Sequence, residues 1–208
     1  MTLSHGLPVK EGRESPGPLA CAEARIRAFV ARSAVPEDPR HADNTLAWLL
    51  RLAPEADAAL RLAALGHDID RAAPDKVRRE DFDDYDAFKA AHARHGAEIL
   101  ARLLDQCGVE AAVRDEACRL VCLHEVGGEP RADLLKDADS LSYFEVNLPL
   151  YYRREGRAEA LRRCVWGIRR LSPRARRLLE DGRFVDPGVA DLVQEALRLA
   201  TSPVPATP

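Results

Sequence analysis

The sequence predicts an all-α protein that folds as a single-domain helical bundle. Apolar residues recur at three- and four-residue steps through most of the chain, and no segment alternates like a half-buried strand. With 208 residues, 46% of them hydrophobic, the chain can bury one sizeable core. We expect one helical domain over residues 19–200, between a flexible N-terminal segment (1–18) and a disordered tail (201–208).

The helices expected in the first part of the chain are separated by glycines, prolines and one charged stretch. A proline-bounded turn divides the first two helices, and Gly108 and the Gly127-Gly128 pair end the fourth and fifth. Residues 71–84 form a charged connection. The expected helices cover residues 19–33, 41–52, 54 to between 66 and 68, 85–106 and 109–125.

In the second part of the chain, helical patterns continue to the tail. The segment 132–152 has a helical pattern that Pro149 should kink or end. Ser172 and Pro173 predict the cap and first turn of a short helix ending near residue 181. Further helices are expected over residues 157–171 and 187–200.

Composition argues against several classes of protein. The net charge of −3 gives no general reason to expect nucleic-acid binding. No apolar run reaches the roughly 18 to 20 residues of a membrane-spanning helix, and the N-terminus lacks the apolar stretch of a signal peptide. The five cysteines are odd in number and form no C-x-x-C pair. We therefore expect a cytoplasmic protein whose cysteines are small, reduced, buried side chains.

One segment departs from the mixed charge of the rest. Residues 151–183 contain eleven arginines and only four carboxylates. This excess could attract an anionic nucleotide or phosphoester. It could equally be a solvated face balanced by the acidic stretch around residues 80–86, which is the interpretation we favour from sequence alone.

Histidines on three expected helices point toward the interior. His92 and His95 share the apolar face of the helix 85–106, His124 continues the apolar face of the next helix, and His67 follows Leu60 and Ala64 at helical steps. A single inward histidine is usually a hydrogen-bonded core residue. Several imidazoles crowded in one small interior need partners, and a shared metal satisfies them together.

Carboxylates occur in the same apolar surroundings. Asp68 directly follows His67 in an apolar context, where a carboxylate is costly unless a cation pairs with it. Asp137 and Asp139 both lie in the helix 132–152, and Asp139 continues its inward face. A mixed imidazole and carboxylate set suits Mn, Fe, Co, Ni or Zn rather than Ca alone.

The order of these residues resembles the HD superfamily of metal-dependent phosphohydrolases. The resemblance lies in His41, the pair His67-Asp68 at a helix end, and Asp139 in an A-D-x-L context, and it covers about residues 20–150. It implies an HD-type helical bundle, with additional helices over 155–200. His92 and His124, between the pair and the last aspartate, resemble the members that hold two metals.

The resemblance also implies roles for these residues. His41, His67, Asp68 and Asp139 would bind one divalent transition metal, and His92 and His124 would bind a second, with Asp68 bridging. Asp139 is preferred to Asp137 because the family's aspartate follows the small residue of A-D-x-L.

The implied reaction is hydrolysis of a small phosphomonoester or phosphodiester, with nucleotides among the candidates, by a metal-activated water. Asp68 and Asp70 are the candidate catalytic residues, and Arg71, Lys89 and His95 the candidate substrate contacts. Exposed, salt-bridged roles are the alternative for Arg71 and Lys89, and an outer-shell role for His95. Asp70 stands where some members carry a nearby glutamate, at a different spacing.

Two other functions fit the same ligands. Some HD proteins use two iron ions and oxygen to cleave C–C or C–P bonds. A non-catalytic sensor could instead keep the pocket to bind a nucleotide, although an intact ligand set argues against that reading.

Overall fold

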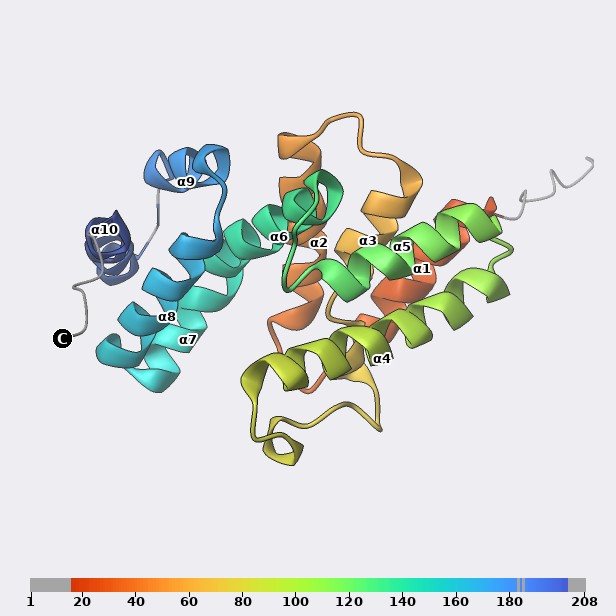
Figure 1. The fold of residues 1–208 in the computed structure, drawn as a ribbon, viewed down its shortest axis with the longest axis horizontal. Coiled ribbons are helices and arrows are strands. Elements are labelled where there is room, and N and C mark those ends of the chain that lie inside the picture. The colour runs from red at the N-terminus through yellow and green to blue at the C-terminus, as the bar shows by residue number, and fades with distance from the viewer. Residues whose placement is uncertain (1–15, 183, 185, 202–208) are drawn as a thin grey trace, which may run out of the picture.

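The computed structural model describes residues 16–182, 184 and 186–201, and within them the chain is all-helical, without strands. The all-α prediction is therefore confirmed (Figure 1). None of the described helices is long and apolar enough to cross a membrane. The α-helices are α1 (Pro18–Val30), α2 (Asp38–Leu52), α3 (Ala58–Gly66), α4 (Tyr85–Gln106), α5 (Ala111–Leu123), α6 (Pro130–Ser142), α7 (Leu148–Glu155), α8 (Arg157–Arg170), α9 (Pro173–Glu180) and α10 (Pro187–Thr201).

Several predicted boundaries are confirmed. The long helix α4 has the predicted limits, and the Ser172 hydroxyl caps α9 by accepting a hydrogen bond from the Ala175 backbone N–H at 3.2 Å. The predicted flexible segment and tail fall almost wholly outside the described residues, although Pro18 already begins α1 and Thr201 ends α10.

Two predictions were wrong in detail. The third helix begins at Ala58 rather than Pro54, because the Asp57 carboxylate caps the Leu60 backbone N–H at 3.1 Å. The segment 132–152 is helical as predicted, but it does not kink or end at Pro149: a π-helical turn (Tyr143–Asn147) divides it earlier into α6 and α7. Pro149 lies in the first turn of α7, where its missing N–H leaves no intrahelical bond unmade.

One continuous core joins the helices. Buried apolar side chains from α1 to α10 form a single cluster, which confirms that the chain folds as one unit. In Figure 1, α1 to α5 lie on one side of α6, and α7 to α10 lie on the other. Helix α4 packs along α5, and α2 packs along α6. The C-terminal ends of α3 and α5 approach α2, α4 and α6 where the predicted ligands His41, His92 and Asp139 lie.

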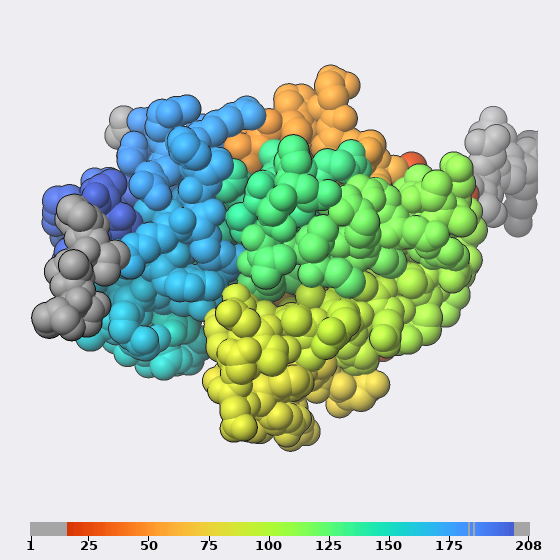
Figure 2. Space-filling view, viewed as in Figure 1, coloured from red at the N-terminus to blue at the C-terminus, as the bar shows by residue number. Residues whose placement is uncertain are grey.

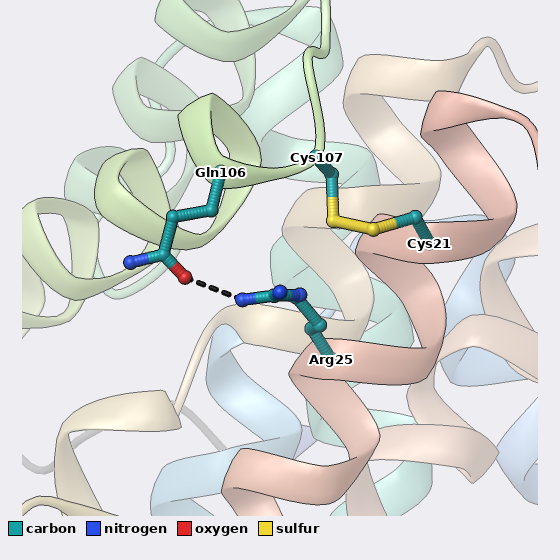
Figure 3. Close-up of a disulfide and its surroundings, with 4 residues drawn as sticks. All are labelled: Cys21, Arg25, Gln106 and Cys107. Carbon is teal, nitrogen blue, oxygen red and sulfur yellow. Dashed lines mark hydrogen bonds between the residues drawn. A yellow bond between two sulfur atoms is a disulfide. The ribbon is translucent and has the colours of Figure 1, made fainter.

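The interpretation of all five cysteines as reduced, buried side chains was wrong. Cys21 on α1 and Cys107, directly after α4, form a disulfide across 86 residues of sequence (Figure 3). Beside it, Arg25 donates a hydrogen bond to the side-chain oxygen of Gln106 at 2.5 Å. Among the remaining cysteines only Cys164 is fully buried, and Cys122 is exposed. Spacing along the sequence carries no signal for a pairing that depends on how α1 lies against α4.

The disulfide should stabilise the fold by restricting the unfolded chain. Because it closes a loop of 86 residues, Cys21→Ser should lower the free energy of unfolding by about 2–4 kcal/mol under non-reducing conditions. Chemical denaturation of both proteins measures this, and Cys122→Ser is the control with no expected effect. Equal stability of wild type and Cys21→Ser, or five titratable thiols in unreduced, denatured wild type, would contradict the pairing.

Candidate metal centre

Five helical elements bring all six predicted metal ligands together. His41 comes from α2, His67 and Asp68 from the end of α3, His92 from α4, His124 from the end of α5 and Asp139 from α6. The four histidines are each at most 4% exposed. The ligand atoms form two groups within which all atoms lie within 4.8 Å of one another: His41, His67 and Asp139, and Asp68, His92 and His124.

Helix ends fix the orientation of two of the imidazoles. His67 and His124 are the residues directly after α3 and α5. The Nδ1 of His67 lies 2.9 Å from the Ala64 carbonyl oxygen, and that of His124 lies 2.6 Å from the Val121 carbonyl oxygen. Carbonyls in the last turn of a helix lack intrahelical donors, so each ring N–H satisfies one of them. In the neutral tautomer that this hydrogen bond favours, the Nε2 of each ring carries the lone pair.

Side chains fix the other two imidazoles in the same way. The Ser142 hydroxyl donates to the His41 carbonyl oxygen at 3.1 Å and can therefore accept from His41 Nδ1, 2.9 Å away. His92 Nδ1 donates to Asp70 Oδ2 at 2.7 Å. All four rings thus have Nδ1 engaged and Nε2 available, which is the arrangement typical of metal-ligating histidines.

The arrangement of these nitrogens is suited to a cation. His41 Nε2 and His67 Nε2 lie 3.2 Å apart, and Asp139 Oδ1 lies 3.1 Å from the first and 3.5 Å from the second. Two imidazoles protonated on Nδ1 direct lone pairs at each other and cannot form a hydrogen bond. A metal ion between them would accept both lone pairs, and nitrogen and carboxylate donors at this spacing suit a transition metal.

Asp68 faces both ligand groups. Its Oδ1 lies 3.0 Å from His92 Nε2, and its Oδ2 lies 3.4 Å from His67 Nε2 and 3.8 Å from His41 Nε2. One carboxylate therefore presents a separate oxygen to each group. This is the position that a bridging ligand between two metal ions would occupy.

Strong local electrostatics keep the carboxylates ionised. Burial by itself would raise the pKa of Asp68, but Arg71, whose guanidinium lies 3.0 Å from Oδ2, and His67 hold that pKa well below its usual range. The pKa of Asp139 is likewise well below its usual range, because hydrogen bonds from His41 and His67 outweigh its burial. Two ionised carboxylates are therefore ready as ligands.

Asp70 supports His92 rather than facing the ligand groups. Its Oδ2 accepts from His92 Nδ1, and its Oδ1 accepts from His95 Nδ1 at 2.5 Å and from the Val77 backbone N–H at 3.2 Å. Its pKa is lowered because hydrogen bonds from His92 and His95 outweigh burial. With both oxygens occupied, Asp70 is poorly placed to act as the catalytic base we predicted.

The predicted substrate contacts have different surroundings. His95 lies in the outer shell, hydrogen-bonded to Asp70 with its Nε2 3.6 Å from Asp75. Lys89 pairs with Asp86 at 3.0 Å, as its alternative predicts, but it is buried rather than exposed. Arg71 pairs with Asp38 and Asp68, and of the three only Arg71 lines the cavity beside the ligands.

The choice between the two late aspartates is clear from their contacts. Asp139 lies among the ligands, as predicted from its context. Asp137 instead accepts hydrogen bonds from the Ser172 backbone N–H at 2.9 Å and from its hydroxyl at 2.5 Å, which attaches the start of α9 to α6.

A cavity of about 820 Å³ opens beside the ligands. It is lined by His41, Asp68 and Asp139 on one side and by α8 on the other, including Arg163, Trp166 and Arg170. In Figure 2, the start of α4 and α8 lie next to each other on the surface, in agreement with a hydrogen bond of 3.3 Å from Arg163 to the Tyr85 hydroxyl. The sequence analysis missed these α8 residues individually, although their steps of three and four predict one helix face.

The helical bundle with buried imidazoles and carboxylates defines a class of candidate metal-binding proteins. The chain itself belongs to the family described as a domain of unknown function, DUF4202, whose profile matches residues 24–193. That match spans every ligand named above. No curated protein and no solved structure matches the chain.

The two late aspartates provide a test of the centre. Asp139→Ala should release metal, because the first ligand group loses its carboxylate. Asp137→Ala should retain metal but lower the melting temperature, because α9 loses its attachment to α6. Elemental analysis and thermal melts of the two variants show which of the two aspartates binds the metal. Metal loss from Asp137→Ala with retention in Asp139→Ala would reverse the assignment.

Proposed function

We propose that this protein is a metal-dependent phosphohydrolase of the HD type. The observation that carries the proposal is the convergence of four imidazole Nε2 atoms, each with its Nδ1 engaged, on two ionised carboxylates. In the interior of a helical bundle, this donor set fits two divalent transition metal ions. His41, His67 and Asp139 would hold one, His92 and His124 the other, and Asp68 would bridge them.

The bound metal pair would supply Lewis acidity, polarising a phosphoester and making a water a better nucleophile near neutral pH. The residues of the chain orient the metal ligands and the substrate. Asp70 fixes the ring of His92, and Ser142 fixes the ring of His41. Arg71 places a permanent positive charge 3.0 Å from Asp68, at the wall of the cavity, where it can bind a phosphate oxygen. Asp68 itself is the link between the two ligand groups.

The cavity supports a small phosphorylated substrate. At about 820 Å³ it falls in the size range of small-molecule sites, and Arg71 and the α8 arginines give part of its wall a positive charge. A phosphomonoester or phosphodiester can therefore reach the centre with its phosphate near Arg71. The same ligands would also suit the two-iron oxygenases, and the identity of the required metal distinguishes the two functions.

Metal content and phosphoesterase activity should depend on the bridging carboxylate. Protein purified without chelator should contain between one and two transition metal ions per chain and hydrolyse members of a phosphoester panel supplied with Mn, Co, Ni, Mg or Fe. Asp68→Ala should lose both metal and activity, whereas Cys118→Ala should keep both. Wild type that neither retains nor is stabilised by any of these metals, or a fully active Asp68→Ala, would overturn the proposal. Turnover that needs iron and oxygen would replace it with the oxygenase.

The variant His92→Ala distinguishes a centre with two metal ions from a centre with one. His92→Ala should reduce metal content toward half, because the first ligand group remains, while activity falls far more steeply. A core histidine would behave differently: its loss would lower the melting temperature and leave metal content unchanged. Elemental analysis and a melting curve of this single variant, beside Cys118→Ala as control, distinguish the two cases.

A further inference from the structure

The α8 wall of the cavity contains a guanidinium that is not neutralised. Arg163 donates a hydrogen bond to the Tyr85 hydroxyl, and its guanidinium lies 4.4 Å from the ring centroid of Trp166. It forms no ion pair with a carboxylate of any described residue, and Glu125 acts on it only at longer range. A partly buried cation without a counter-ion is costly, so its position at a cavity wall points to an anionic ligand.

Three other arginines that line the cavity form ion pairs with carboxylates. Arg170 pairs with Glu125 at 3.3 Å, Arg154 pairs with Glu155 at 2.7 Å, and Arg71 pairs with Asp38 and Asp68. Arg79 also lines the cavity without a carboxylate partner, but its guanidinium donates to the Phe82 carbonyl oxygen. Arg163 lines the same cavity as His41, Asp68 and Asp139, and its only side-chain hydrogen bond among the described residues goes to a neutral hydroxyl.

A second donor lies beside Arg163. The hydroxyl of Tyr143 is buried and has no hydrogen-bond acceptor among the described residues. The guanidinium of Arg163 lies 5.7 Å from the centroid of the Tyr143 ring, and both residues line the cavity. A guanidinium without a carboxylate partner and a hydroxyl without an acceptor are suited to the oxygens of one anionic group.

We propose that Arg163 and Tyr143 bind a second anionic group of the substrate, separate from the phosphate at the metal centre. The inference rests on the proposed function and narrows its substrate class: a phosphoester that carries a further phosphate or carboxylate. The cavity is large enough for such a molecule, and Arg71 already places a guanidinium beside the ligands for the reacting phosphate. Arg163 contacts Tyr85 and Trp166 instead, and it forms no ion pair with Asp68 or Asp139.

Non-hydrolysable phosphonates test the inference by binding alone. Calorimetry with the Mn-loaded protein would compare propylphosphonate, which has one anionic group, with propylene-bisphosphonate and phosphonobutyrate, which have two. At least one of the two-anion probes should bind wild type about tenfold or more tightly than propylphosphonate, because it gains a charge-assisted contact. The preferred probe shows whether the second group is a phosphate or a carboxylate.

The variants assign this gain to particular side chains. Arg163→Gln should remove the tenfold advantage and leave propylphosphonate binding within about twofold of wild type. Tyr143→Phe, which keeps the ring, should lower the affinity for the two-anion probe by a smaller factor, about two- to threefold. Arg162→Gln is the matched control: Arg162 is the adjacent residue on α8, exposed and paired with Glu159, and its loss should change neither affinity. Arg163→Lys, which keeps the charge, should be intermediate, and melting curves confirm that each variant is folded.

Three results would overturn the inference. Two-anion probes no tighter than propylphosphonate in wild type would show that there is no second subsite, while the proposed function survives. Equal weakening of all probes by Arg163→Gln would place Arg163 at the reacting phosphate instead. Wild type that binds none of the phosphonates would contradict the proposed function, and this inference with it.

Discussion

The structure depends on one constraint: imidazole lone pairs and ionised carboxylates lie together in a dry interior. His41 and His67 direct nitrogens at each other across 3.2 Å, and Asp68 and Asp139 add negative charge beside them. Buried carboxylates need positive or hydrogen-bonding partners, and Arg71 and the imidazoles supply them here. If the proposed metal ions bind at this centre, they should stabilise the fold as well as the site.

The positions of the ligands follow from helix geometry. His67 and His124 each occupy a helix end, where a ring N–H can satisfy a free carbonyl oxygen. His92 and Asp139 lie inside long helices, which hold their side chains on rigid supports. Asp70 then orients His92 from a short turn after α3. Each ring is held either by a helix or by a hydrogen bond at a helix end. In both cases the nitrogen that faces the centre is not used for this purpose.

The C-terminal helices complete the cavity rather than merely covering the bundle. The π-helical turn after α6 places Tyr143 on the cavity wall, and such turns are frequent at functional sites. Asp137 attaches α9 to α6, and α8 brings Arg163 opposite the ligands. The basic segment that we interpreted from sequence as a solvated face is thus divided: Arg162 is exposed to solvent, whereas Arg163 faces the cavity. The two arginines differ in the face of α8 on which they lie, and a count of charges in the sequence does not show this difference.

The sequence by itself determined the all-α class and most helix boundaries, because helical periodicity is a local property. It also placed His67, His92, His124 and Asp139 on inward helix faces, whereas the full set of six residues that gather at the centre came from the resemblance to the HD superfamily. It also favoured Asp139 over Asp137. Tertiary structure alone decided that Asp70 supports His92, that Cys21 pairs with Cys107 and that Arg163 lies opposite the ligands. Each of these contacts depends on how segments distant in sequence pack against each other, and no local sequence pattern encodes that packing.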